Sequence, residues 1–292
     1  MSKASSSHER LATRIGGLSG IASASSMPND AEQVVEELLR ALEAGEVRAA
    51  ERDASGNWRA VPWVKQGILL GFRVGQVIDM TAYVSEGAPA RFFFFDKHTF
   101  PPHGFDMTDG VRIVPGGSSI RRGAYVAPGV VCMPPMYINV GAYVGEGTMV
   151  DSHALVGSCA QVGRNCHISA AAQIGGVLEP VGALPVIVED EVLVGGNCGV
   201  YEGTVVKRRA VLGSGTILTR STPVYDIAHG QVYSATDDQP LVIPEDAVVV
   251  AGSRSITRGP GKEWGISLYT PVIVKYRDSK TETRIQLEDL LR

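Results

Sequence analysis

The chain has little of what marks several large protein classes. Its 292 residues include only four cysteines without CxxC spacing, so neither a zinc knuckle nor a disulfide framework is indicated, and a reducing, cytoplasmic location is expected. The sequence contains no run of about 18 apolar residues, so it predicts no membrane span. The Ser- and Ala-rich N-terminus lacks the apolar core of a signal peptide. A formal net charge of −4 gives no basic excess that would favour nucleic acid or an anionic membrane as partner.

Glycine, in contrast, is abundant, with 34 residues. An aliphatic or small apolar residue also recurs every sixth position. The first series comprises Val114, Ile120, Val126, Cys132, Ile138, Val144, Val150, Val156, Val162, Ile168 and Ile174. After an insertion that contains Pro180 and Pro185, the second series comprises Val188, Val194, Val200, Val206, Leu212, Leu218 and Val224.

The residues around each of these positions follow the same period. The residue directly after each aliphatic position is often glycine, as at Gly145 and Gly157. The residue four positions after the aliphatic one is mostly small, as at Ala142 and Ala160. Neither a helical period of 3.6 nor a strand period of 2 explains a period of six. A coil of short strands joined by tight corners does explain it, and the repeat therefore predicts a parallel β-helix.

The segments outside the repeat predict smaller elements. A helix capped by Asn29 or Asp30, a hairpin-like turn at 53–57 and a second helix from Pro62 precede the coil. Strands at 247–251 and 267–275, a Gly-rich basic loop at 252–265 and a short helix at 287–291 follow it. The aromatic run 92–95 is interpreted as core or subunit interface rather than as a ligand site. The expected domains are a flexible segment (1–29), an α/β domain (30–110), the β-helix (111–229) and a small C-terminal β domain (230–292).

Several strings resemble one enzyme family beyond the generic repeat. They are YINVGAYVGEGTMVDSHALVGSCAQVG at 137–163, IGGVLEPVGALPVIVED at 174–190 and SLYTPVIVK at 267–275, with weaker support from 61–74 and 94–97. From about residue 30 onward the chain is similar to tetrahydrodipicolinate N-succinyltransferase. The resemblance implies a left-handed parallel β-helix, a handedness that the general preference for right-handed crossovers would not predict.

The resemblance also implies the chemistry. Family members are homotrimers with sites between neighbouring coils, and they transfer succinyl from succinyl-CoA to the amine of ring-opened tetrahydrodipicolinate in lysine and diaminopimelate biosynthesis. Two rivals remain open. One is an acetyl-CoA-dependent acyltransferase acting on the same or a sugar-nucleotide acceptor, and the other is a non-catalytic β-helix trimer. The sequence does not decide the acyl donor from first principles.

The resemblance assigns the acceptor site to two residues. Asp151 would contact the acyl-accepting nitrogen, orient the ammonium and accept its proton. The alternative is a corner residue, because aspartate tolerates such geometry. Arg112 would bind a substrate carboxylate, which a guanidinium fork contacts bidentately, or would form a surface salt bridge instead.

Glu202 is a second candidate for the acid function, with one reservation. The family carries a further acidic residue three positions earlier, where this chain has Gly199. Either Glu202 supplies that function, or the site relies on Asp151 alone.

The cosubstrate succinyl-CoA is expected to lie along the groove between coils. Gly213 and Ser214 would let the backbone approach the pantetheine arm, and Arg254, Arg258 and Lys262 would meet the phosphates or be solvated surface charge. No metal is expected, although His153 and His167 lie in the coil. Cys166 and Cys198 are expected in its interior.

Overall fold

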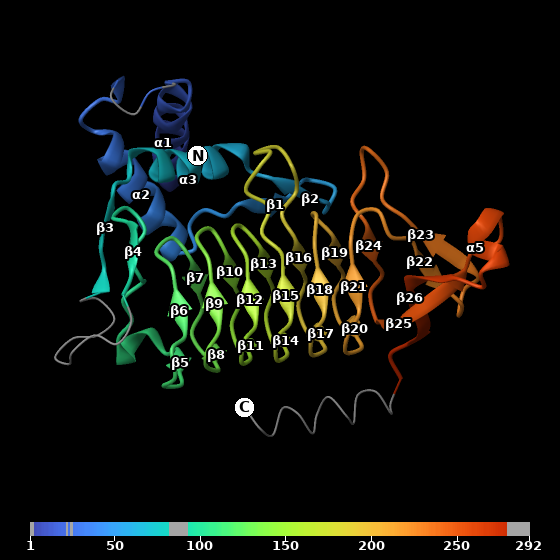
Figure 1. The fold of residues 1–292 in the computed structure, drawn as a ribbon. Helices are drawn as coiled ribbons and strands as arrows, with labels where there is room; N and C mark the ends of the chain where they lie inside the picture. Colours follow the sequence, from blue (N-terminus) through green and yellow to red (C-terminus); the bar gives the residue numbers. More distant parts are fainter. Residues whose placement is uncertain (1–2, 22, 24–25, 82–92, 279–292) are drawn as a thin grey trace.

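Three stacks of parallel two-residue strands form the body of the molecule (Figure 1). The structure is a computed structural model that describes residues 3–21, 23, 26–81 and 93–278. One coil contributes β10, β11 and β12 to the three stacks, and each stack is named after its strand from this coil. The β10 sheet consists of β7 (Tyr125–Val126), β10 (Tyr143–Val144), β13 (Gln161–Val162), β16 (Ile187–Val188), β19 (Val205–Val206) and β24 (Val242–Ile243).

The other two sheets complete each coil. The coil strands of the β11 sheet are β5 (Arg112–Ile113), β8 (Val131–Cys132), β11 (Met149–Val150), β14 (His167–Ile168), β17 (Leu193–Val194) and β20 (Val211–Leu212). The β12 sheet consists of β6 (Ser119–Ile120), β9 (Tyr137–Ile138), β12 (Leu155–Val156), β15 (Gln173–Ile174), β18 (Gly199–Val200) and β21 (Ile217–Leu218). The chain thus passes through all three sheets in turn, which confirms the predicted parallel β-helix.

The six-residue repeat forms the interior of the coil. In each strand the second residue points inward and pairs with its equivalent one coil away, as Val144 does with Val162. Both side chains are fully buried. The small residue four positions later, such as Ala142 or Cys166, fills the adjoining interior space and is also buried. Side chains at the first strand position point to the outside, where the coil meets other elements.

The start of the repeat differs from the prediction. The sequence series begins at Val114, but the structure pairs Ile113 with Cys132, nineteen residues later, whereas Cys132 pairs with Val150 after eighteen. Gly116 and Gly117 lie in the intervening turn with φ of 146° and 90°. This wider glycine corner accommodates one extra residue, which glycine permits because it lacks Cβ.

The N-terminus also differs from the flexible segment expected over 1–29. Helix α1 (Lys3–Ser19) places Leu11, Ile15 and Leu18 in a core with helices α2 (Ala31–Glu43) and α3 (Pro62–Val74). The reason is their spacing of four and three residues, which forms one apolar face within a Ser-rich segment. As predicted, α3 begins at Pro62.

Two small hairpins complete the N-terminal domain. Strands β1 (Ala50–Arg52) and β2 (Trp58–Ala60) lie against the β10 sheet, where Ala50 packs with Ile187 and Val205. Strands β3 (Val77–Asp79) and β4 (Phe95–Lys97) form the other hairpin, and a 3₁₀ turn covers Met107–Asp109. Residue 92 lies outside the described residues, and Phe93 and Phe95 are more than half exposed. Within this chain, therefore, that part of the aromatic run is not core.

The chain leaves the coil after β21 and returns to it. Strands β22 (Val224–Asp226) and β23 (Gln231–Tyr233) form a hairpin. After it, β24 and the start of β25 (Ala247–Ser255) stack on the coil, which therefore continues beyond its predicted end at residue 229. Strand β25 pairs with β26 (Ser267–Tyr276) in a ribbon at the far end of the molecule (Figure 1).

The remaining expectations for the C-terminus have mixed outcomes. Both predicted strands are present, but the predicted basic loop contains the end of β25 and the short helix α5 (Gly259–Glu263). The helix expected at 287–291 lies outside the described residues. None of the helices in the described ranges is both long and apolar enough to cross a bilayer.

Candidate functional site

The coil has three edges, and they separate the predicted site residues. One edge consists of the turns that connect the β11 sheet to the β12 sheet and is called the β11–β12 edge. The turns from the β12 sheet to the β10 sheet form the β12–β10 edge. Asp151, Gly213 and Ser214 lie on the first edge, because they belong to turns that follow strands of the β11 sheet. Glu202 lies on the second edge, in the turn after β18.

Asp151 is held on both sides by the coil. Its backbone N–H donates to the carbonyl of Ile168 (2.9 Å), and its Oδ1 accepts the backbone N–H of Ser152 (2.7 Å). Its φ is not positive. The left-handed residue of this turn is His153, with φ of 62°. A need for left-handed geometry therefore does not explain the aspartate.

His167 is a titratable neighbour of Asp151. The Nε2 atom of His167 lies 3.6 Å from Oδ2 of Asp151, and the two side chains are 16% and 28% exposed. Strand pairing places them together, because Met149, two residues before Asp151, is in register with His167. The sequence prediction considered His167 only as a metal ligand. The signal for this contact was its position one coil after Met149.

No group of three His, Cys, Asp or Glu side chains suited to a metal ion occurs among the residues that the structure describes. The thiols are likewise poor ligands or nucleophiles. Cys166 and Cys198 are buried in the coil as predicted, and burial raises the pKa of Cys198. Burial also raises the pKa of Cys132 and that of Cys159 to about 12, so the thiolate is scarce near neutral pH.

Arg112 lies on the same sheet as Asp151. It begins β5, which pairs with β8, which in turn pairs with β11. Two strand spacings amount to about 10 Å along the coil axis, and an extended arginine side chain covers part of this distance. The Arg112 side chain is exposed and forms no ion pair with any of the described residues, so the predicted alternative of a surface salt bridge is absent there.

The predicted CoA residues lie at the other end of the same edge. Gly213 and Ser214 follow β20, three coil levels from Asp151, or about 14 Å at the usual strand spacing. Arg254 lies farther along β25, opposite Leu268, and Lys262 is in α5. Arg254 and Lys262 are exposed. The basic residues thus extend the β11–β12 edge toward the C-terminal ribbon.

Glu202 is separated from Asp151 within one chain. It lies on the β12–β10 edge, two coil levels away, with φ of 55°, and its Oε2 accepts the backbone N–H of Arg220 (2.8 Å). It lines a cavity of about 1040 Å³ beside the insertion at 175–184. The charged residues around this cavity are mostly acidic: Asp53, Glu179, Glu202, Asp237 and Asp238 against Arg59 and Arg220. The acidic lining of this cavity therefore disfavours the phosphates of CoA.

Tyr201 is a neighbour of Glu202 that the sequence prediction did not single out. Its ring folds back over Gly199, where a Cβ atom would lie 2.9 Å from the tyrosine hydroxyl. A Cβ at Gly175 would lie 2.7 Å from the same ring. The phenol thus occupies the space in which a side chain at position 199 would begin. The signal was a glycine at an outward strand position two residues before an aromatic residue.

Comparison with known proteins supplies the family. The family pattern described as tetrahydrodipicolinate N-succinyltransferase N-terminal matches residues 20–74, and the hexapeptide repeat of succinyl-transferase matches residues 185–220. The chain is similar to 2,3,4,5-tetrahydropyridine-2,6-dicarboxylate N-succinyltransferase of Leptothrix cholodnii, with 43% identity over 92% of this chain and 93% of the relative. The Methylobacterium sp. (strain 4-46) enzyme of the same name is 40% identical over 89% of each chain.

A solved structure from Campylobacter jejuni, described as a 2,3,4,5-tetrahydropyridine-2-carboxylate N-succinyltransferase, aligns with a TM-score of 0.47 and 16% identity, over 87% of this chain and 64% of that one. The curated relatives are matched over nearly their whole length at about 40% identity. The chain therefore belongs to the tetrahydrodipicolinate N-succinyltransferase family.

Proposed function

We propose that this protein transfers the succinyl group of succinyl-CoA to the amine of ring-opened tetrahydrodipicolinate, in the biosynthesis of diaminopimelate and lysine. Membership of the family supports this activity. The observation that carries the proposal is the arrangement along the β11 sheet, where an exposed arginine, a fixed carboxylate and a glycine-containing turn follow one another.

Asp151 would handle the proton of the acceptor. Near neutral pH the amine is mostly an ammonium, which has no lone pair with which to attack. A carboxylate holds the ammonium by charge and accepts its proton. The nitrogen then attacks the thioester carbonyl carbon, the C–N bond forms and the C–S bond breaks. CoA departs as a thiolate and takes up a proton.

Arg112 would hold one of the two carboxylates of the acceptor. An exposed guanidinium without a carboxylate partner in the described residues is available for a bidentate contact. The donor would extend along the β11–β12 edge, with Gly213 and Ser214 beside the pantetheine arm. Arg254 and Lys262 would lie near the phosphates.

A homotrimer is part of the proposal. Asp151 and Glu202 lie on different edges and at different coil levels, so a site that uses both carboxylates needs two copies of the chain. The outer faces of the β11 and β12 sheets carry partly exposed aliphatic residues, including Leu155, Leu193 and Ile217, which a neighbouring copy would cover.

A thiol-release assay tests the activity. Purified protein with tetrahydrodipicolinate should release free CoA from succinyl-CoA much faster than from acetyl-CoA, with Asp151→Asn protein as the background control. Release from acetyl-CoA alone would overturn the assignment of the donor. The absence of release from both donors would favour the non-catalytic alternative.

A further inference from the structure

A second cavity lies on a different face of the coil, between the β1–β2 hairpin and the β10 sheet. Its volume is about 320 Å³. Arginine is unusually frequent in its wall: Arg48, Arg52, Arg164 and Arg208 face two carboxylates, Glu189 and Asp190. The aromatic rings of Trp58 and Tyr143 complete the lining. The activity proposed above uses none of these residues.

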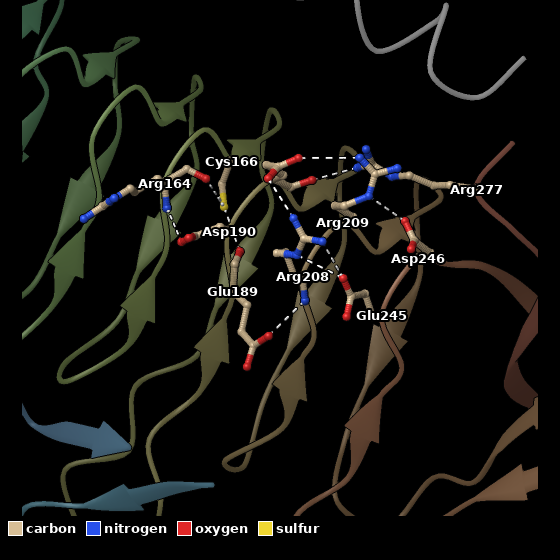
Figure 2. A network of polar contacts seen from close by, with 10 residues as sticks. Arg164, Cys166, Glu189, Asp190, Arg208, Arg209, Glu245, Asp246 and Arg277 are labelled. Atoms are coloured by element: carbon tan, nitrogen blue, oxygen red, sulfur yellow. Dashed lines mark hydrogen bonds and ion pairs between the residues drawn. The ribbon is translucent and has the colours of Figure 1, made fainter. Parts of the chain in front are cut away.

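The charge of Glu189 is already satisfied by its neighbours. Its side chain is only 9% exposed and accepts three hydrogen bonds, from Arg52 (2.7 Å), from the indole N–H of Trp58 (2.9 Å) and from the backbone N–H of Arg208 (3.0 Å). Figure 2 shows the last of these contacts. Nζ of Lys207 also lies 3.6 Å from Oε1 of this carboxylate. Glu189 therefore compensates Arg52 and Lys207 and has little capacity left to compensate Arg48.

Arg48 lacks such compensation. Its Nε donates to Gln161 (2.8 Å), and its guanidinium lies 3.6 Å from the centre of the Tyr143 ring. No carboxylate of the described residues forms an ion pair with it, although the charge of Asp190 acts on it from a greater distance. Burial lowers the pKa of Arg48. Charges that are partly removed from water are normally paired, so this half-buried arginine lacks the counterion that its partial burial favours.

Arg164 provides a second cation beside the same cavity. Its backbone N–H donates to Asp190 (2.8 Å), whereas its side chain is exposed and makes no ion pair within the described part of the chain. Figure 2 shows the Arg164 side chain extending away from Asp190. The cavity thus combines a rigid, half-buried guanidinium with a movable one.

We propose that this cavity is an oxyanion-binding site, in which Arg48 and Arg164 hold a phosphate or carboxylate group. A guanidinium presents paired N–H donors that match either group bidentately, and the ring stack and Gln161 pre-organise that of Arg48. The bound anion would supply the missing counterion and bridge the N-terminal hairpin to the coil.

Calorimetric titration of the full-length protein with inorganic phosphate tests the proposal, with succinate in a parallel arm and ionic strength held constant by NaCl. A saturable binding event that requires Arg48 is expected, in addition to any binding at the proposed acceptor and CoA sites. The comparison of the two arms distinguishes phosphate from carboxylate as the group preferred in this event. Arg48→Met should weaken binding about 10- to 100-fold, as expected for the loss of a charge-assisted contact. Arg164→Ala should weaken it severalfold.

Two controls locate the effect. Arg59→Met removes a cation from the same hairpin but from the wall of the other cavity, and Arg254→Ala removes one from the predicted CoA site. Arg59→Met should keep the wild-type affinity for phosphate, and Arg254→Ala should leave the binding event that requires Arg48 unchanged. If Arg48→Met does not fold, Arg164→Ala decides, because its exposed side chain makes no contact that folding requires. Wild-type affinity in the Arg164 variant, or no binding of either anion at millimolar concentration, would overturn the proposal.

Discussion

The Oδ2 atom of Asp151 lies 3.6 Å from Nε2 of His167, across two neighbouring strands of the β11 sheet. The other carboxylate oxygen accepts the N–H of Ser152, so the carboxylate has one defined orientation at the β11–β12 edge. An imidazole at this distance forms an ion pair with the carboxylate whenever the ring is protonated. Arg112 and Gly213 lie to either side along the same sheet.

Replacing Asp151 by Asn should lower turnover and leave assembly and CoA binding intact. Asparagine keeps the shape of the side chain but cannot accept the proton of the ammonium, and general-base contributions are typically about 10²–10⁴-fold. Steady-state kinetics should show a loss in that range, with partial recovery at high pH, where more amine is free. His153→Asn in the same turn is the matched control, because asparagine tolerates positive φ. Near wild-type turnover of Asp151→Asn would remove this residue from the mechanism.

Replacing Arg112 by Ala should mainly weaken binding of the acceptor. Losing a charge-assisted contact to a carboxylate costs about 1.5–3 kcal/mol, or roughly 10- to 100-fold in the apparent constant. The constant for succinyl-CoA should barely change, because the predicted donor residues lie at the opposite end of the edge. Equal shifts in both constants would instead indicate a structural role for Arg112.

Mixing two inactive variants tests the shared site. If Asp151 and Glu202 act together from different copies, Asp151→Asn and Glu202→Gln proteins that are unfolded and refolded together should regain about a quarter of the wild-type sites in random trimers. Light scattering should give about three times 31.0 kDa for the wild type. A Glu202→Gln variant with full activity would show that Asp151 acts without it, and a monomer at micromolar concentration would exclude the shared site.

A methyl group at Gly199 should destabilise the fold because the Tyr201 ring occupies its space. Gly199→Ala should lower the free energy of unfolding by about 1–3 kcal/mol, the usual cost of overpacking, as measured by denaturant titration. In a Tyr201→Ala background the same substitution should cost much less, since the clashing ring is gone. Gly182→Ala serves as the control, because nothing lies within 4 Å of its Cβ position. Equal costs in both backgrounds would contradict the steric explanation.

The buried amine of Lys65 should make stability depend on alkaline pH. The side chain is fully buried in α3, and its Nζ donates to the carbonyl of Ala183 (2.6 Å) in the insertion that lines the large cavity. Burial lowers the pKa of Lys65 below its usual 10.5. Between the folded and unfolded pKa the unfolded chain binds more protons, so stability should rise with pH in that window.

Lys65→Met provides the comparison. The free energy of unfolding of the wild type, measured by denaturant titration from pH 8 to about 10.5, should rise relative to that of the variant. Lys275→Met is the control, because the Lys275 side chain is 44% exposed. The stability of this protein should follow that of the wild type. Parallel curves for the Lys65 variant and the wild type would show that the amine titrates alike in both states.

Much of this protein is determined by local sequence. Inward positions such as Val144 and Val162 recur every six residues because one strand and one corner take six residues, so the repeat alone predicted the coil and its core. The long strings shared with the family predicted the activity and led to Asp151. A segment with weak patterning was harder: Ile15 and Leu18 form a helical face, but the Ser-rich composition around them masked it.

Tertiary structure decided what depends on stacking. The order of the sheets determines which residues share an edge. Only the fold therefore places Gly213 on the same edge as Asp151, and Glu202 on a different edge. Arg48 contacts Tyr143, and Lys65 contacts Ala183. Each of these contacts joins segments that are about a hundred residues apart in the sequence. Such contacts leave no periodic signal, because they depend on how the N-terminal domain packs against the finished coil. The sequence therefore determined the repeating coil, and the packing of distant segments determined its sites.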